Sequence, residues 1–286
     1  MPGNNPMGIS LVDDTRYTIV KTGDGSYTLY LRDYDEHMHS LSGAYEEALL
    51  KHVIPSGITN NRVSSLHVLD VGFGLGYNIL ALVVELKRSG FSGSISVTSL
   101  EKDRSFLPAL QSIHFDDSRD RFYSLIQRAY HDGSCDSGGI SISVLFGDAR
   151  KFIRTLPDET FDAVFFDPFS PAHNPELWSV DLFTIIRRSM KETAILTTYS
   201  CAPQVRAALL EAEFIIGRGP SVGGKREGTL AARTPVIAAL PAPDVELLLC
   251  NRRAVPYRDP LLSRDRDTII RERSGEIKRL RSEKNI

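Results

Sequence analysis

The 286-residue chain has few cysteines, and the three that it has, Cys135, Cys201 and Cys250, lie far apart. None of them belongs to a CxxC pair or to a cysteine and histidine spacing typical of metal ligands. A zinc motif and a disulfide framework are therefore excluded as explanations of the fold. We expect three free thiols and no metal site.

Long apolar runs are also missing, because no window approaches the roughly 18 consecutive apolar residues that a membrane span requires. The N-terminal sequence MPGNNPMGIS has neither the basic start nor the apolar stretch of a signal peptide. A content of 42% hydrophobic and 24% charged residues is ordinary for a soluble globular protein. We therefore expect a cytoplasmic protein with a substantial core and no membrane partner.

Charge is unevenly distributed along the chain. Residues 251–286 carry a surplus of five positive charges, which leaves −7 for residues 1–250 and gives the net −2 of the whole sequence. A basic tail is suited to a polyanionic partner. The alternative is a solvated, partly disordered end, because this segment mixes charges of both signs.

Turn chemistry predicts a small β hairpin near the N-terminus. The apolar alternation of 17–19 and 27–31 flanks a turn that contains Asp24-Gly25, a pair typical of hairpins. Apolar spacing then predicts a helix over 43–53, which Pro55 ends.

From Leu66 onward, short apolar runs alternate with helix-like segments. The runs HVLDVG, ISVTSLE, ISVLFG, FDAVFFD and TAILTTY are predicted strands, and the predicted helices cover 79–87, 106–110, 149–155, 180–190 and 205–213. This alternation is typical of a doubly wound α/β fold whose mainly parallel sheet carries helices on both faces. The segment HDGSCDSGGI, residues 131–140, is predicted to be a flexible loop. We divide the chain into a hairpin and helix cap (1–60), an α/β domain (61–240) and a charged, net basic extension (241–286).

Acidic residues stand where the predicted strands end. Asp167 follows FDAVFF and opens a proline-punctuated loop, Glu101 ends SVTSLE, and Asp148 follows ISVLFG. Open α/β sheets bind ligands at the carboxyl ends of their strands, so we expect these carboxylates to border one crevice. Each of them alone is equally typical of a turn or a helix cap.

A glycine-rich turn follows the first strand of the predicted sheet. Gly72, Gly74 and Gly76 have the spacing GxGxG, and Tyr77 stands where a GxGxxG dinucleotide fingerprint requires its third glycine, so NAD and FAD are disfavoured. With Asp70 just ahead, the turn resembles the first motif of S-adenosylmethionine-dependent methyltransferases.

That resemblance implies S-adenosyl-L-methionine as the cofactor. Glu101 is then expected at the ribose hydroxyls and Asp148 beside the adenine amino group. Further cofactor contacts are expected from Gly72, Phe73, Gly74, Gly76, Asn78, Ala149 and Glu47. For Glu47, a salt bridge to Lys51 four residues on is the simpler alternative.

Three segments together carry a narrower resemblance. VGFGLGYN, DPFSPAHNPELW and GGKREG resemble the methyltransferase domain of the bacterial tRNA 5-methylaminomethyl-2-thiouridine biosynthesis family, over roughly residues 31–233. Many members have Asp-Gly where this chain has Asp167-Pro168, so the backbone freedom of the loop differs. The resemblance implies methylation of the aminomethyl group on a tRNA wobble uridine, with Asp167 as a base or an orienting group. Lacking a second glycine fingerprint, the chain looks like a stand-alone methyltransferase without the flavin-dependent oxidase.

Candidate contacts to the tRNA anticodon loop lie in two segments. His173, Asn174 and Trp178 follow Asp167 and are expected to stack on and read an exposed base. Core packing is the alternative for Trp178, which stands at the apolar start of a predicted helix. Lys225 and Arg226, flanked by glycines, are expected to contact phosphates, with solvent exposure alone as the alternative.

Two other functions fit parts of the pattern. An aminopropyltransferase resembling spermidine synthase also pairs an N-terminal hairpin with a GxGxG domain, and it uses a decarboxylated form of the cofactor. Tight binding of intact S-adenosylmethionine would separate the two. A non-catalytic RNA-binding module is the remaining alternative, although the chain keeps Asp167, Glu101 and the glycines. The oligomeric state is not predictable from these patterns.

Overall fold

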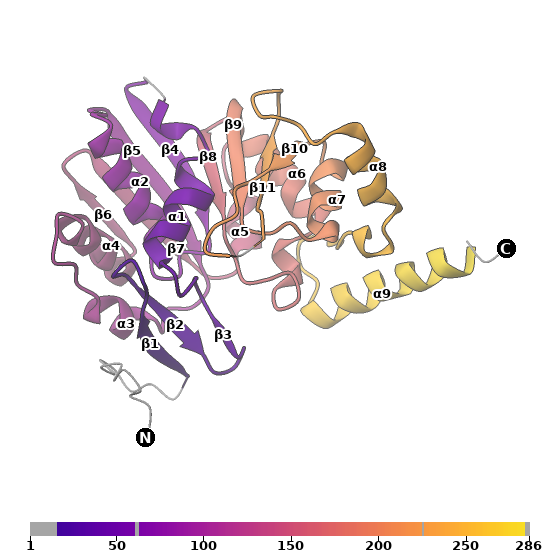
Figure 1. The fold of residues 1–286 in the computed structure, drawn as a ribbon, viewed down its shortest axis with the longest axis horizontal. Coiled ribbons are helices and arrows are strands. Elements are labelled where there is room, and N and C mark those ends of the chain that lie inside the picture. The colour runs from indigo at the N-terminus through magenta and orange to yellow at the C-terminus, as the bar shows by residue number, and fades with distance from the viewer. Residues whose placement is uncertain (1–15, 61–62, 225, 284–286) are drawn as a thin grey trace.

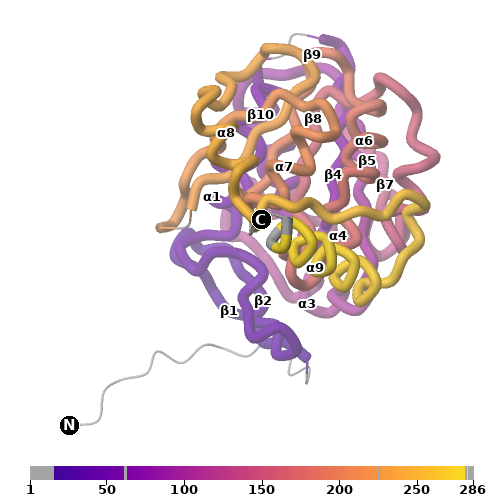
Figure 2. The backbone as a smooth tube through the Cα atoms, turned by 90° about the vertical axis from the view of Figure 1, so that its right-hand side faces the viewer, coloured from indigo at the N-terminus to yellow at the C-terminus, as the bar shows by residue number. Residues whose placement is uncertain are grey.

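A computed structural model describes residues 16–60, 63–224 and 226–283. Its N-terminal part is a small antiparallel sheet of three strands, β1 (Tyr17–Lys21), β2 (Tyr27–Leu31) and β3 (Glu36–His37). The predicted hairpin is confirmed, whereas β3 was not predicted. Figures 1 and 2 both show this sheet at one end of the main body.

The hairpin turn and the following helix are joined by hydrogen bonds. The Asp24 carboxylate accepts the backbone N–H of Glu46 at 2.8 Å, and the Ser26 hydroxyl accepts that of Ala44 at 3.0 Å. These bonds satisfy N–H groups that a helix start leaves without intrahelical partners. The helix, α1 (Ala44–Ala48), continues directly into a wider π-helical turn, η1 (Leu49–Val53), where the N–H of Ile54 reaches the carbonyl of Leu49 at 3.0 Å. The predicted helix is confirmed, and the π turn is an addition.

An eight-stranded sheet forms the centre of the molecule (Figure 1), in the order β10-β11-β9-β8-β4-β5-β7-β6. Neighbouring strands are parallel except where β6 and β11 pair with their neighbours. The predicted mainly parallel sheet is therefore confirmed. The strands are β4 (Ser65–Val71), β5 (Ser94–Glu101), β6 (Ser134–Ser137), β7 (Ile140–Phe146), β8 (Phe161–Phe166), β9 (Met190–Thr198), β10 (Ile215–Arg218) and β11 (Thr229–Ala232).

Apolar side chains cover both faces of the sheet. Val68 and Phe165 belong to one buried cluster, and their neighbours Leu69 and Phe166 belong to another, as the two-residue period of a strand requires. The first cluster packs against α1, α2 (Tyr77–Arg88), α3 (Leu107–Ser112) and α4 (Asp120–Asp132). The second packs against α5 (Ala149–Ile153), α6 (Val180–Ser189) and α7 (Pro203–Glu211). Helices thus lie on both faces, as predicted.

The segment 131–140 is not the flexible loop that its glycines suggested. It contains the end of α4 and the strand β6, which pairs antiparallel with β7 through a tight turn. Gly138 and Gly139 both have positive φ, 59° and 78°, the conformation that a two-residue hairpin turn of this kind needs. The prediction was wrong because it took a hairpin turn for a loop.

The C-terminal residues form α8 (Ala242–Cys250), the 3-10 turn η4 (Arg252–Ala254) and the long helix α9 (Arg266–Glu283). Figure 1 shows α9 projecting from the body. Asp265 begins it by accepting the N–H of Thr268 at 2.8 Å, and Arg264 pairs with Glu272 at 2.5 Å. Residues 266–283 are therefore helical, while the polyanion contact expected of this basic segment stays a prediction. Among the described residues, none of the helices has the length and apolar character needed to cross a bilayer.

The order of the sheet reverses between β4 and β8. From β4 the chain continues to β5 and β7 on one side, whereas β8 leads to β9 on the other. The two strand ends lie close together, because the N–H of Asp167 bonds the carbonyl of Val71 at 2.9 Å. A Cβ on Gly72 would lie 2.6 Å from the carbonyl oxygen of Asp167, so this approach requires glycine. Such a reversal is where α/β folds bind ligands.

Candidate active site

A cavity of about 1160 Å³ lies at the carboxyl ends of β4, β5, β7 and β8. Residues around β3 and the loop after β8 complete its wall. It is large enough for a ligand of nucleoside size or more. Eleven residues proposed from the sequence line it: Glu47, Gly72, Phe73, Gly74, Asn78, Glu101, Asp148, Ala149, Asp167, His173 and Asn174. Gly76, Trp178 and Arg226 are not among the lining residues, and Lys225 falls outside the described part of the chain.

The glycine turn combines two different roles. Gly74, with φ of 53°, faces the cavity, since a Cβ there would meet only the methyl group of Met38, at 3.6 Å. Gly76 has φ of 76° and begins α2, but a Cβ there would collide with Ile126 of α4. Gly76 is therefore a close-packing position, and its contact with the cofactor stays a prediction. The neighbouring Tyr77 is buried, and its hydroxyl accepts the N–H of Tyr27 at 2.9 Å, which ties the turn to the hairpin.

Glu101 organises the turn from the end of β5. Its carboxylate accepts backbone N–H groups from Gly74 at 3.0 Å, Lys102 at 2.7 Å and Asp103 at 2.9 Å. Burial raises the pKa of Glu101, and these three donors work against that increase. Its contact with ribose hydroxyls remains a prediction.

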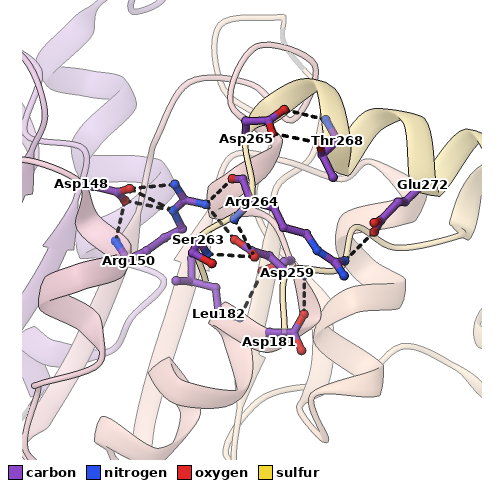
Figure 3. Close-up of polar contacts among 11 residues, drawn as sticks. Asp148, Arg150, Asp181, Leu182, Asp259, Ser263, Arg264, Asp265, Thr268 and Glu272 are labelled. Atoms are coloured by element: carbon purple, nitrogen blue, oxygen red, sulfur yellow. Dashed lines mark hydrogen bonds and ion pairs between the residues drawn. The ribbon is translucent and has the colours of Figure 1, made fainter. Parts of the chain in front are cut away.

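Asp148 is held by an arginine that also contacts the C-terminal segment (Figure 3). It caps α5 by accepting the N–H of Arg150 at 3.0 Å, and the Arg150 guanidinium pairs with it at 2.7 Å. The same guanidinium donates at 2.7 Å to Asp259, which is fully buried, and to the carbonyl of Arg264. Burial alone would raise the pKa of Asp148, but the bonds from Arg150 outweigh it and hold this pKa below its usual range. The C-terminal extension is thereby fixed to the predicted adenine end of the cavity, where Arg266 also lines the wall.

Asp167 lies at the mouth of the sheet with 23% of its side chain exposed. Its Oδ1 is 3.6 Å from Nε2 of His52, and its Oδ2 accepts the amide of Asn78 at 3.2 Å. Burial would raise the pKa of Asp167, but His52 first, and then His39 and Asn78, hold it below its usual range. Asp167 is therefore a carboxylate anion at neutral pH.

A second, fully buried carboxylate lies behind it. Asp70 accepts the amide of Asn78 at 3.2 Å and the hydroxyl of Ser99 at 2.5 Å. Burial raises the pKa of Asp70 to about 7 despite these two bonds, and the nearby Asp167 adds to the increase. The amide group of Asn78 therefore bridges two carboxylates, which fixes its orientation at the cavity wall.

Trp178 does not contact the cavity, so the prediction that it stacks on a base is corrected. It is fully buried against Phe166 and Tyr199, and its indole N–H donates to the carbonyl of Phe169 at 2.9 Å. Packing of the apolar start of α6 placed it in the core, as the alternative interpretation held. Its bond to Phe169 fixes the loop that carries the substrate-facing residues.

Aromatic rings from two segments meet at the edge of the cavity. The ring centroid of Tyr34, which lies beside β3, is 5.0 Å from the ring centroid of Phe169 and 5.0 Å from that of His173. His173 also lies 3.8 Å from the carboxylate of Glu36. We call Tyr34, Phe169 and His173 the aromatic lip. Its rings are candidates to stack on a base in place of Trp178.

The glycine-flanked loop after β10 reaches the same edge through Gly223. The side chain of Arg226 is exposed, and its carbonyl accepts a hydrogen bond from Lys51 at 2.9 Å. Glu47 accepts the N–H of Ser40 at 2.6 Å from the cavity wall. Neither observation tests the phosphate or cofactor contact expected of Arg226 and Glu47.

Several site residues were not predictable from sequence patterns. His52 and Arg150 read as ordinary positions of predicted helices, and their partners Thr197, Asp167 and Asp259 are distant in sequence. Glu176 was also missed. It lines the cavity, and its Oε2 is buried without a hydrogen-bond partner among the described residues. The three cysteines are free, as predicted.

Known proteins share this architecture. The profile of a family described as S-adenosyl-L-methionine-dependent methyltransferase matches residues 115–234. The crystal structure of MNMC2 from Aquifex aeolicus superimposes with a TM-score of 0.82 at 30% identity, over 93% of this chain and 87% of that one. The chain belongs to this methyltransferase family. The methyltransferase is also 34% identical to an uncharacterized protein of Methanocaldococcus jannaschii, over 93% of this chain and 74% of the other.

A further relative is the tRNA 5-methylaminomethyl-2-thiouridine biosynthesis bifunctional protein MnmC of Ralstonia nicotianae, at 31% identity over 70% of this chain. The methyltransferase spans only about a third of the length of that relative, since the match covers 32% of it. The cofactor of this methyltransferase is S-adenosyl-L-methionine, as the description of the matching family says. The cavity fits this cofactor, because open space faces Gly74 and carboxylates border the cavity at the ends of β5 and β7.

Proposed function

We propose that this enzyme methylates the aminomethyl group of a tRNA wobble uridine, converting 5-aminomethyluridine or its 2-thio form to the 5-methylaminomethyl product. One observation carries the proposal. The Asp167 carboxylate is held as an anion at the edge of the cavity, next to the glycine turn, where an amine acceptor needs a negative partner. Similarity to the MnmC proteins, whose name states a role in biosynthesis of this tRNA nucleoside, supports the same acceptor.

The chemistry required of the protein is mainly placement. When bound, S-adenosylmethionine supplies a methyl group already activated by its sulfonium. An aliphatic amine is largely protonated at neutral pH, so it must lose a proton before its lone pair is available. Asp167 accepts an N–H of this group and turns the nitrogen toward the cavity, and near-attack placement of this kind lowers the barrier. Because its pKa is low, Asp167 acts as an orienting group, and the proton that the ammonium group loses passes to solvent water.

The other cavity residues take matching roles in this proposal. Gly74, Glu101 and Asp148 hold the cofactor, and the aromatic lip stacks on the target base. The carboxylate of Glu176, whose Oε2 has no hydrogen-bond partner in the described part of the chain, favours a cationic amine over a neutral acceptor. Arg226 contacts tRNA phosphate from the exposed loop. A tRNA substrate also implies a cytoplasmic location.

The test uses purified protein, methyl-labelled S-adenosylmethionine and tRNA from a strain that lacks this modification. We expect label in the 5-methylaminomethyl nucleoside after digestion, and none with fully modified tRNA. The Asp167→Ala variant serves as the matched control and should be inactive. Absence of label on the wobble nucleoside would refute the proposal. Transfer from decarboxylated cofactor to a free polyamine would favour the aminopropyltransferase instead.

A further inference from the structure

A buried histidine lies directly behind Asp167. The His52 side chain is only 1% exposed and comes from the π turn η1, with its ring 5.9 Å from that of Phe165. Its Nδ1 is 3.0 Å from the hydroxyl of Thr197 on β9, and its Nε2 is 3.6 Å from Oδ1 of Asp167. The second distance exceeds a hydrogen bond but lies within the range of an ion pair. The imidazole thus connects the N-terminal helix, β9 and the candidate catalytic carboxylate.

The neighbours of the ring determine where its protons lie. If the Thr197 hydroxyl donates to Nδ1, then Nε2 carries the single proton of a neutral imidazole. If that hydroxyl instead donates to the carbonyl of Val164, 3.5 Å away, then Nδ1 donates to Thr197. Nε2 must then be protonated as well, because otherwise its lone pair would face a carboxylate. Both arrangements direct an N–H of His52 at Asp167.

We propose that His52 is a positioning residue for methyl transfer, whose Nε2–H holds the Asp167 carboxylate as an anion aimed into the cavity. Asn78 restrains Oδ2 from the other side, so both oxygens are fixed from within the protein. Only the cavity-facing lone pairs remain for the substrate nitrogen. The role in turnover rests on the function proposed above, whereas the coupling of His52 to Asp167 does not.

Other ionisable groups lie near this pair. Asp70 on β4 interacts with both of its members, and His39 after β3 and Tyr199 after β9 interact with Asp167. Tyr199 in turn interacts with Glu36 and Glu47. The charges of Asp70 and Asp167 repel each other, and His39 is the other ionisable group that favours the Asp167 anion. Removing His52 should therefore shift Asp167 toward its protonated form, since repulsion and burial would no longer be balanced.

The activity test compares two variants of His52. His52→Gln keeps an N–H donor near the position of Nε2 but removes the titratable ring, and His52→Leu removes both. We expect His52→Leu to lower kcat on the order of 10-fold to 100-fold at pH 7, as misplacement of a reacting group does. The acidic limb of the kcat/KM profile should move to higher pH. His52→Gln should retain more of kcat, and the cofactor Kd should stay within about twofold in both variants.

A second measurement needs no turnover. In protein labelled with ¹³C-aspartate, the Asp167 carboxyl group is titrated by NMR in the wild type and in both His52 variants. We expect the titration midpoint of Asp167 to rise in the variants, most in His52→Leu, because the histidine that favours the anion is lost. An unchanged midpoint, or a His52→Leu enzyme with wild-type kcat and pH profile, would overturn the proposal. If His52→Leu fails to fold, His52→Gln and the NMR titration still decide. A shifted midpoint without any tRNA activity would refute the proposed substrate but not the coupling.

Discussion

Asp167 and Asp148 occupy equivalent places in the fold, yet they are stabilised in different ways. Each follows a parallel strand, β8 and β7, lines the same cavity and has a pKa below the usual range. The partners of Asp167 are a buried histidine at 3.6 Å and the amide of Asn78. The partner of Asp148 is Arg150, which stays charged at any pH of interest. The same fold position is thus stabilised by an imidazole and an amide at one end and by a permanent charge at the other.

The largest expected effect separates chemistry from cofactor binding. Asp167→Asn should lower kcat on the order of 10²-fold to 10⁴-fold, because a neutral amide lacks the negative charge that attracts the amine and does not take up its proton. The cofactor Kd, measured by calorimetry, should stay near wild type. Asp148→Asn is the matched change at the other end, and it should weaken cofactor binding while sparing kcat at saturation. If both variants changed kcat and the cofactor Kd in the same way, the proposed difference between the roles of Asp167 and Asp148 would be wrong.

The second prediction concerns stability at the Asp148 end. Arg150→Met leaves the buried Asp259 without its cationic partner, and breaking such a pair typically costs about 3–5 kcal/mol. The free energy of unfolding in denaturant should fall by this order. The double variant Arg150→Met/Asp259→Asn should recover a large part, because the unpaired charge is gone. If the single and double variants had the same free energy of unfolding, Asp259 would not be an unpaired anion in Arg150→Met.

A third prediction extends the comparison to Asp70, whose pKa burial raises to about 7. Between pH 4 and pH 7 the folded state holds a proton on Asp70 that the unfolded state has lost. Stability from this group is therefore present at low pH and decreases as pH rises through this window, by at most about 1.4 kcal/mol per pH unit. Asp70→Asn should flatten that slope in denaturant titrations at several pH values. If the free energy of unfolding of Asp70→Asn depended on pH as strongly as that of the wild type, the slope would come from other groups.

The smallest effect belongs to the exposed loop. Arg226→Ala should weaken tRNA binding uniformly across tRNAs and reduce the slope of log Kd against log salt by about one unit. Arg252→Ala, an exposed arginine on η4, is the control and should leave the slope unchanged. If both variants behave alike, the phosphate contact is not at this loop.

Local patterns predicted the scaffold of the site but not its electrostatics. The strands, the glycine turn and the carboxylates at Glu101, Asp148 and Asp167 follow from apolar periodicity and from the geometry of parallel sheets. The helix α4 was not predicted, but its sequence allows the prediction, because Tyr123, Ile126 and Tyr130 have helical spacing and Gly133 follows. The roles of His52 and Arg150 could not be predicted from the sequence, since they depend on partners that only the fold brings together.

The π turn η1 determines the direction in which His52 points. Its wider turn holds one residue more than an α-helical turn, and Lys51 and His52 within it are both buried. If the same residues formed a regular α-helix, the positions after the turn would be rotated by about 100° and the imidazole would face away from β9. The contact of His52 with β9 and Asp167 therefore depends on the extra residue in this turn.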